Sequence, residues 1–316
     1  MAVDLDDPES REVFERGKEI LGVDLRPILR DGPQEELNST RISQPAIFLH
    51  SMAVLRVLAK LWNVPRPFCQ GVPAFATAGL SLGEYSALVF AGSLDFEDAL
   101  GIVKLRGEYM QEACIATKGT MASVLGLLAE AVEKVVGECR AAGCRVGVAN
   151  YNSPDQTVIS GTVEAVADAT ARLVEAGARR VIPLKVAGAF HSPLMASATE
   201  KLAPFLRKIP IEEPEVPFYS NVTGARVEDP EAIRQGLIDQ LESPVRWKQI
   251  MGALVEGGLK CAYEIGPGRV LQGLLRNIEK GVEVISAGTK VDLEKLKDLS
   301  PQLSRGELRD PEKILR

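Results

Sequence analysis

Residues 74–92 read AFATAGLSLGEYSALVFAG, and this stretch decides how the rest of the chain is organised. An apolar run leads into Gly79-Leu80-Ser81-Leu82-Gly83, and a helix-forming segment follows as far as Gly92. A GxSxG pattern between a strand and a helix is typical of a nucleophilic serine, because the glycines leave room for a sharp turn that exposes it. The alternative is a serine that only caps the helix. The remaining sequence must therefore supply a base and a binding group.

Composition limits the classes of protein that the chain can belong to. Its 316 residues are 46% hydrophobic, enough for a large core, and the net charge of −6 disfavours a nucleic-acid partner. The most apolar helix expected, residues 46–62, is interrupted by His50, Arg56 and Lys60, so we expect no membrane span. The acidic N-terminus is not typical of a signal or transit peptide. Five scattered cysteines without a CxxC pair indicate a soluble protein of a reducing compartment and argue against a zinc site.

The order of expected elements divides the chain into two units. Residues 119–187 alternate as β-α-β-β-α-β, the order of a ferredoxin-like unit. It interrupts a larger α/β domain, with a mostly parallel sheet, formed by residues 1–118 and 188–292. We expect helices from Asp7 to Leu21 and from near Pro45 to Trp62. The charged tail, residues 293–316, is poorly patterned, and we expect little of it to pack.

The chain has only two histidines, which shortens the search for a base. His50 lies in an apolar helix and is interpreted as a packed core residue. His191 follows a strand and precedes a helix that begins at Pro193, so it lies in a loop held by rigid elements. An imidazole suits a general base for serine, because its pKa lies near neutral pH. The alternative is a histidine that caps the next helix.

Arg106 is unusual because it falls in the apolar stripe of its helix, with Ile102, Val103 and Met110 on the same face. A buried guanidinium needs a partner. That partner is either an internal carboxylate, such as Glu84 or Glu108, or the carboxylate of a substrate. The second possibility predicts acyl transfer from a substrate that carries its own carboxylate.

With these residues the sequence resembles the malonyl-CoA:acyl-carrier-protein transacylases of dissociated fatty-acid synthesis. The resemblance covers about residues 7–291. Its motifs are GLSLGEYSALVFAG, KLRGEYMQEA, NYNSP, VAGAFHSPLM, QLESPVRW and YEIGPGRVLQGL. It implies a hydrolase-like α/β fold with a ferredoxin-like insert, and a monomer that uses malonyl-CoA and acyl carrier protein without metal, bound cofactor, nucleic acid or membrane.

The resemblance also implies a role for individual residues. Ser81 would be the nucleophile, His191 the base and Arg106 the ligand of the malonyl carboxylate. Gln240 would help to orient the histidine, and Phe190 would leave little space for an α-methyl branch.

One motif of the family has no counterpart here. Family members begin with a strand and a GQGxQ loop that supplies an oxyanion donor, whereas this sequence reaches its first helix within a few residues. The resemblance therefore implies only one oxyanion donor in this sequence, the amide of Leu82. Leu80 stands where many bacterial members have histidine and plastid-type members do not, which implies a plastid stroma or a bacterial-type cytoplasm.

Two other functions remain open from the sequence. GxSxG and a histidine serve serine hydrolases and thioesterases equally well. Arg106 distinguishes the two possibilities, because a hydrolase of neutral esters has no use for a buried arginine, whereas a substrate with a carboxylate needs one. The missing GQGxQ motif is also consistent with an inactive, truncated relative.

Overall fold

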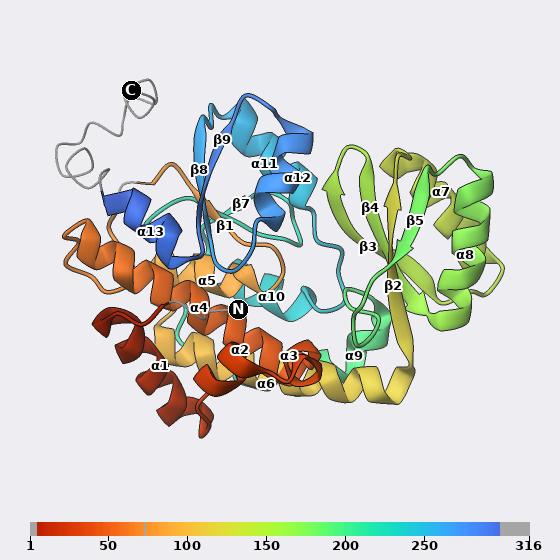
Figure 1. The fold of residues 1–316 in the computed structure, drawn as a ribbon. Coiled ribbons are helices and arrows are strands. Elements are labelled where there is room, and N and C mark those ends of the chain that lie inside the picture. Colours follow the sequence, from red (N-terminus) through yellow and green to blue (C-terminus); the bar gives the residue numbers. More distant parts are fainter. Residues whose placement is uncertain (1–4, 73, 298–316) are drawn as a thin grey trace.

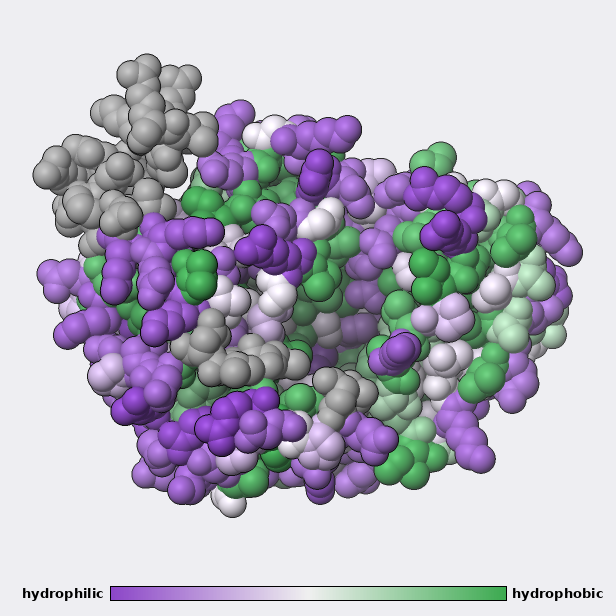
Figure 2. Space-filling view, viewed as in Figure 1, coloured by the Kyte–Doolittle hydropathy of each residue, from purple (hydrophilic) through white to green (hydrophobic). Residues whose placement is uncertain are grey.

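The computed structural model describes residues 5–72 and 74–297. In these ranges the chain forms a large α/β part and a smaller four-stranded unit, which lie side by side in Figure 1. A hollow opens between the two parts on the face shown in Figure 2. The mixed fold agrees with the α/β class expected from the sequence.

The first helices form one side of the large part. The expected helix α1 spans Pro8–Leu21, where Asp7 accepts a hydrogen bond from the Ser10 amide and Gly22 ends the helix with φ +73°. Two short helices that the sequence pattern did not predict follow, α2 at Arg26–Asp31 and α3 at Gln34–Asn38.

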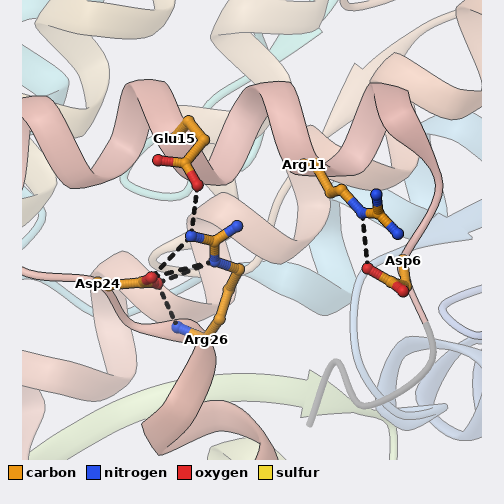
Figure 3. A network of polar contacts seen from close by, with 5 residues as sticks. All are labelled: Asp6, Arg11, Glu15, Asp24 and Arg26. Atoms are coloured by element: carbon orange, nitrogen blue, oxygen red, sulfur yellow. Dashed lines mark hydrogen bonds and ion pairs between the residues drawn. The ribbon is translucent and has the colours of Figure 1, made fainter.

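A surface network ties the first two helices together, as Figure 3 shows. Arg26 contacts Asp24 at 2.7 Å and Glu15 of α1 at 2.5 Å, while Arg11 pairs with Asp6 at 2.8 Å. These side chains are partly or largely exposed, so the pairs contribute little to stability and mainly fix the path of the loop between α1 and α2.

Helix α4 runs from Thr40 to Leu61, five residues earlier than the start that we expected at Pro45. The physical reason is a tertiary contact with helix α6, Phe96–Thr117. Its Gln111 accepts hydrogen bonds from the Thr40 amide at 3.0 Å and the Thr40 hydroxyl at 2.8 Å. This contact satisfies one of the amide donors that have no partner inside the first turn of a helix. By length and composition α4 could cross a membrane, but 78% of its most apolar window is buried, as in the core helix of a globular fold.

Helix α4 packs on α6. These two helices form the main core together with α1, α5 (Gly83–Phe90) and α9 (Ala196–Leu206). The strands of the large part are short and fall into two sheets instead of the single one expected. The first has the order β1-β6-β7, with β1 parallel to β6, and the second pairs β8 with β9 in parallel. Their bounds are Thr77–Ala78, Phe218–Tyr219 and Arg226–Val227 for the first, and Cys261–Ile265 and Glu283–Ala287 for the second.

The remaining helices of the large part lie on both sides of its short strands in the chain. They are α5 at Gly83–Phe90, the 3-10 turn η1 at Pro193–Met195 with α9 at Ala196–Leu206, α10 at Pro230–Asp239, α11 at Trp247–Glu256 and α12 at Val270–Ile278.

The last described helix corrects an expectation. Helix α13 spans Lys290–Lys297, and its Leu293 and Leu296 are 5% and 1% exposed within the main core. The start of the tail therefore packs, because two leucines three residues apart share one helix face despite the charged residues around them. The expectation for residues 298–316 lies outside the described residues.

The smaller unit has the topology expected from its β-α-β-β-α-β order. Its sheet order is β3-β4-β2-β5 with antiparallel pairing throughout. The apolar residues of α7 and α8 pack against this sheet and form a second core. The elements are β2 at Gly119–Leu125, α7 at Ala129–Ala141, β3 at Val146–Ser153, β4 at Gln156–Thr162, α8 at Val163–Glu175 and β5 at Arg180–Pro183.

Edge strand β3 also bonds to the large part. The Tyr151 amide donates to the Val245 carbonyl at 2.8 Å, and the Val245 amide donates to the Ala149 carbonyl at 2.8 Å. Nearby, Gly119 at the start of β2 lies so close to Ala189 that an added Cβ would be 2.4 Å from the alanine Cβ. These two contacts between the units lie near the loop that carries His191, and α11 and α12 also pack against β3.

Candidate active site

Ser81 lies at the sharp turn between β1 and α5, as the GxSxG pattern predicts. Its φ is +51°, a left-handed conformation that is strained for a residue with a side chain. A Cβ on Gly79 would lie 2.0 Å from the Gly83 carbonyl carbon and oxygen, whereas a Cβ on Gly83 would meet nothing within 4 Å. Our expectation that both glycines make room for the turn is therefore wrong for Gly83. The turn requires only Gly79, because the backbone crosses itself there.

His191 is buried, with 5% of its surface exposed, and its Nε2 lies 2.9 Å from Ser81 Oγ. Its Nδ1 lies 2.8 Å from the backbone carbonyl of Gln240. A carbonyl can only accept, so Nδ1 carries the proton and Nε2 is left as the acceptor that faces the serine. Burial, followed by the charge of Arg106, lowers the pKa of His191 to about 4. The imidazole is therefore neutral near pH 7, as a base requires.

Arg106 reaches the same point from α6 and is 1% exposed. Its Nη2 donates to Ser81 Oγ at 3.1 Å and to Gln240 Oε1 at 2.9 Å, and its Nη1 donates to Gln44 Oε1 at 2.5 Å. All three acceptors are neutral. Within residues 5–72 and 74–297 no carboxylate lies within 4.0 Å of the guanidinium, so the ion pair with Glu84 or Glu108 that we considered is not formed.

The charge of Arg106 is thus buried without a counter-ion in contact. Burial lowers its pKa below the ordinary value for arginine, but a guanidinium remains protonated in proteins. The side chain stands over the Tyr85 ring, with its Cζ 5.9 Å from the ring centroid. Such an arrangement favours an anionic group that enters beside the serine.

Gln240 and Asn221 hydrogen-bond to the backbone of the turn that carries Ser81. Gln240 Nε2 donates to the Ser81 carbonyl at 3.0 Å, and Asn221 Oδ1 accepts from the Ser81 amide at 2.6 Å. Asn221 Nδ2 donates to the Gly79 carbonyl at 2.7 Å. The sequence analysis found Gln240 through the family resemblance but missed Asn221 and Gln44. No local pattern marks either residue, because their partners are distant in the chain.

The other two expected site residues are Leu82, next to the serine, and Phe190, next to His191. Leu82 precedes α5, and the next amides of the turn, from Gly83 onward, bond to carbonyls of the turn itself. The Leu82 amide has no such acceptor in the part of the chain that the structure describes, so it can serve an oxyanion. Phe190 is partly buried against the sheet of the smaller unit, where it packs with Met121, Ala149 and Val158.

A cleft of about 580 Å³ adjoins the histidine loop. His191 and Ser192 line it on one side, and Tyr151, Ser160 and Arg145 of the smaller unit line it on the other. The cleft does not include Ser81 or Arg106. It therefore reaches the histidine from the side of the smaller unit.

Comparison with known proteins agrees with this geometry. The acyl transferase domain family matches residues 10–299. A malonyl CoA-acyl carrier protein transacylase of Bacillus subtilis is 40% identical over 287 residues, which cover 91% of this chain and 88% of the relative.

Solved structures give the same result. The malonyl CoA-acyl carrier protein transacylase of Coxiella burnetii superposes with a TM-score of 0.86 at 37% identity, covering 93% of this chain and 90% of that one. A malonyl-transacylase solved in complex with a type II polyketide acyl-carrier protein gives a TM-score of 0.86 at 38% identity, covering 94% and 95%. The chain belongs to the acyl transferase domain family.

Proposed function

We propose that this protein transfers a malonyl group from coenzyme A to the phosphopantetheine thiol of acyl carrier protein through a malonyl-serine intermediate. The observation that carries the proposal is the buried Arg106 guanidinium, 3.1 Å from Ser81 Oγ and without a carboxylate in contact. The names of the relatives support the same reaction.

In the first half-reaction, Ser81 Oγ attacks the thioester carbonyl carbon while its proton passes to His191 Nε2. The hydrogen bond of 2.9 Å between these atoms provides the path. The Leu82 amide donates to the oxyanion of the tetrahedral intermediate. The C–S bond then breaks, and His191 returns the proton to the coenzyme A thiolate.

Arg106 binds the free carboxylate of the malonyl group. A planar guanidinium can grip it through two parallel charge-assisted hydrogen bonds, and burial keeps water from competing. Binding also gives the guanidinium the counter-ion that it lacks in the fold. Phe190, at the wall formed by the smaller unit, would limit branching next to the thioester.

In the second half-reaction, the thiol of the carrier's phosphopantetheine arm replaces coenzyme A. His191 takes the thiol proton, the thiolate attacks the malonyl ester, and the proton returns to Ser81 Oγ as the ester bond breaks. The unit of residues 119–187 would form one wall of the approach, with residues 1–118 and 188–292 carrying the reacting groups.

The test is intact-mass analysis after incubation with malonyl-CoA. We expect one malonyl adduct, which Ser81→Ala abolishes, and loss of the adduct when acyl carrier protein is added. A hydrolase would instead turn over without an adduct and release free malonate. An inert relative would give neither product, and a fluorophosphonate probe would leave Ser81 unlabelled.

A further inference from the structure

Glu84 is a buried carboxylate that this reaction does not use. It lies in the first turn of α5, three residues after the serine, and only 1% of its surface is exposed. Its Oε1 accepts from the Asn221 amide at 2.9 Å, and its Oε2 accepts from Gln240 Nε2. The Ser220 hydroxyl also hydrogen-bonds to it. Within the described residues no cation lies within ion-pair distance, so its partners are neutral donors.

These contacts fix which group donates and which accepts in the hydrogen bonds that Gln240 makes with Arg106, Glu84 and Ser81. Arg106 can only donate, so the oxygen of the Gln240 amide must face it, at 2.9 Å. An ionised carboxylate can only accept, so the nitrogen of the same amide must face Glu84. The two charged groups on either side therefore leave Gln240 one amide orientation. In that orientation Nε2 also donates to the Ser81 carbonyl at 3.0 Å.

The second arm of the network runs through Asn221. Its backbone amide is held by Glu84, and its side chain bonds to both the Ser81 amide and the Gly79 carbonyl. One carboxylate thus supports both residues that hold the turn. A strained φ of +51° at Ser81 persists only where the surroundings over-determine it.

We propose that Glu84 is a positioning residue of the acyl-transfer site, whose acceptor-only carboxylate orients Gln240 toward Arg106 and clamps the turn that carries Ser81. The inference rests on the function proposed above. Glu84 touches no reacting atom and acts through Gln240 and Asn221.

The charge state of Glu84 gives a specific readout. Burial raises its pKa to about 7, opposed by the hydrogen bonds from Asn221, Gln240 and Ser220 and by the charge of Arg106. Protonation would add a donor where the network needs acceptors. Activity should therefore increase with pH, so that the pH–rate profile has a rising limb centred near pH 7. The other titratable groups that face the network do not titrate there: the pKa of His191 is lowered to about 4, that of Tyr85 is raised to about 12, and Arg106 stays charged.

The experiment compares Glu84→Gln and Glu84→Asp with a control, Glu108→Gln, which removes the same charge from a partly exposed position two residues beyond Arg106. For each folded protein, checked by circular dichroism, we would measure the rate of Ser81 malonylation by malonyl-CoA and of fluorophosphonate labelling between pH 5 and 9. In Glu84→Gln both rates should fall about 10- to 100-fold, because a donor replaces an acceptor in a buried network. The limb near pH 7 should vanish.

The other variants complete the test. Glu84→Asp keeps the acceptors but is one methylene shorter, so it should be slower than wild type with its limb retained but shifted. Glu108→Gln should match wild type in both rate and profile.

Two results would overturn the proposal. One is a folded Glu84→Gln protein with wild-type rates and an unchanged limb. If that variant does not fold, a folded Glu84→Asp protein with wild-type rates and an unmoved limb does the same, since the limb would then belong to another group. Failure of the proposed function is distinguishable: the wild type would form no malonyl adduct, while the fluorophosphonate rates would still report on Glu84.

Discussion

Replacing Arg106 with alanine tests whether its unpaired charge is meant for the substrate. In the proposed complex the malonyl carboxylate accepts two charge-assisted hydrogen bonds in a site where the guanidinium is 1% exposed. At about 1.5–2 kcal/mol each, their loss removes about 3–4 kcal/mol of binding in the transition state. One decade in rate corresponds to about 1.36 kcal/mol, so kcat/KM for malonyl-CoA should fall about 10²–10³-fold.

The same change should affect acetyl-CoA little, because an acetyl group has no carboxylate to bind. The fold should also survive. Gln44 and Gln240 lose a donor, but a guanidinium with no carboxylate in contact no longer has to be buried.

The assay is stopped-flow acylation of Ser81 with malonyl-CoA and acetyl-CoA in parallel, with thermal unfolding as the control. Arg106→Lys, which keeps the charge without the planar fork, should give an intermediate malonyl rate. Equal losses for both acyl groups, together with a large drop in Tm, would refute the reasoning. Arg106 would then be a structural residue, and a hydrolase would become the better proposal.

Four further predictions concern the stability of the fold. Gly79→Ala should destabilise the protein by at least about 2 kcal/mol in urea unfolding, whereas Gly83→Ala should be neutral or stabilising by up to about 1 kcal/mol; equal effects would contradict the backbone crossing. Between pH 4 and 6.5 the lowered pKa of His191 should make stability rise with pH, because the unfolded state binds the proton more tightly, and His191→Ala should remove this rise. Glu84 should have the opposite effect on stability, because its raised pKa makes stability fall as pH rises from 4.5 to 7. A stability profile that Glu84→Gln leaves unchanged would disprove this. Leu296→Ala should cost about 2–4 kcal/mol in the same unfolding assay; no cost would mean that α13 is not part of the core.

The three side chains that the structure brings together, Ser81, His191 and Arg106, could be singled out because each leaves a local mark in the sequence. Ser81 follows from a strand, a glycine turn and a helix that are contiguous in the chain. His191 follows from the scarcity of histidine and from its place in a loop before a proline. Arg106 follows from a charge in an apolar stripe, where the helical period alone predicts burial.

The supporting groups left no such mark. Asn221 lies 140 residues from the serine amide that it holds, and nothing near it in the sequence indicates that contact. Glu84 occupies a first-turn helix position where an acidic residue is ordinarily explained by the helix dipole and solvent. Its burial depends on elements that arrive from elsewhere in the chain. The same holds for α4, which begins at Thr40 because Gln111 caps it across the interface with α6.

The pair of backbone hydrogen bonds between edge strand β3 and Val245 has a mechanical consequence. Together with the close approach of Gly119 to Ala189, it attaches the smaller unit to the large part beside the histidine loop, where α11 and α12 also pack against β3. When one unit rotates against another, the displacement is smallest next to the points of attachment. We therefore expect any relative rotation of the two units to widen or narrow the hollow seen in Figure 2 at its outer rim, while the distance between Ser81 and His191 stays nearly constant. In the proposed reaction the mouth could then adapt to thioester carriers as different in size as coenzyme A and a whole carrier protein, while the Ser81–His191 contact stays unchanged.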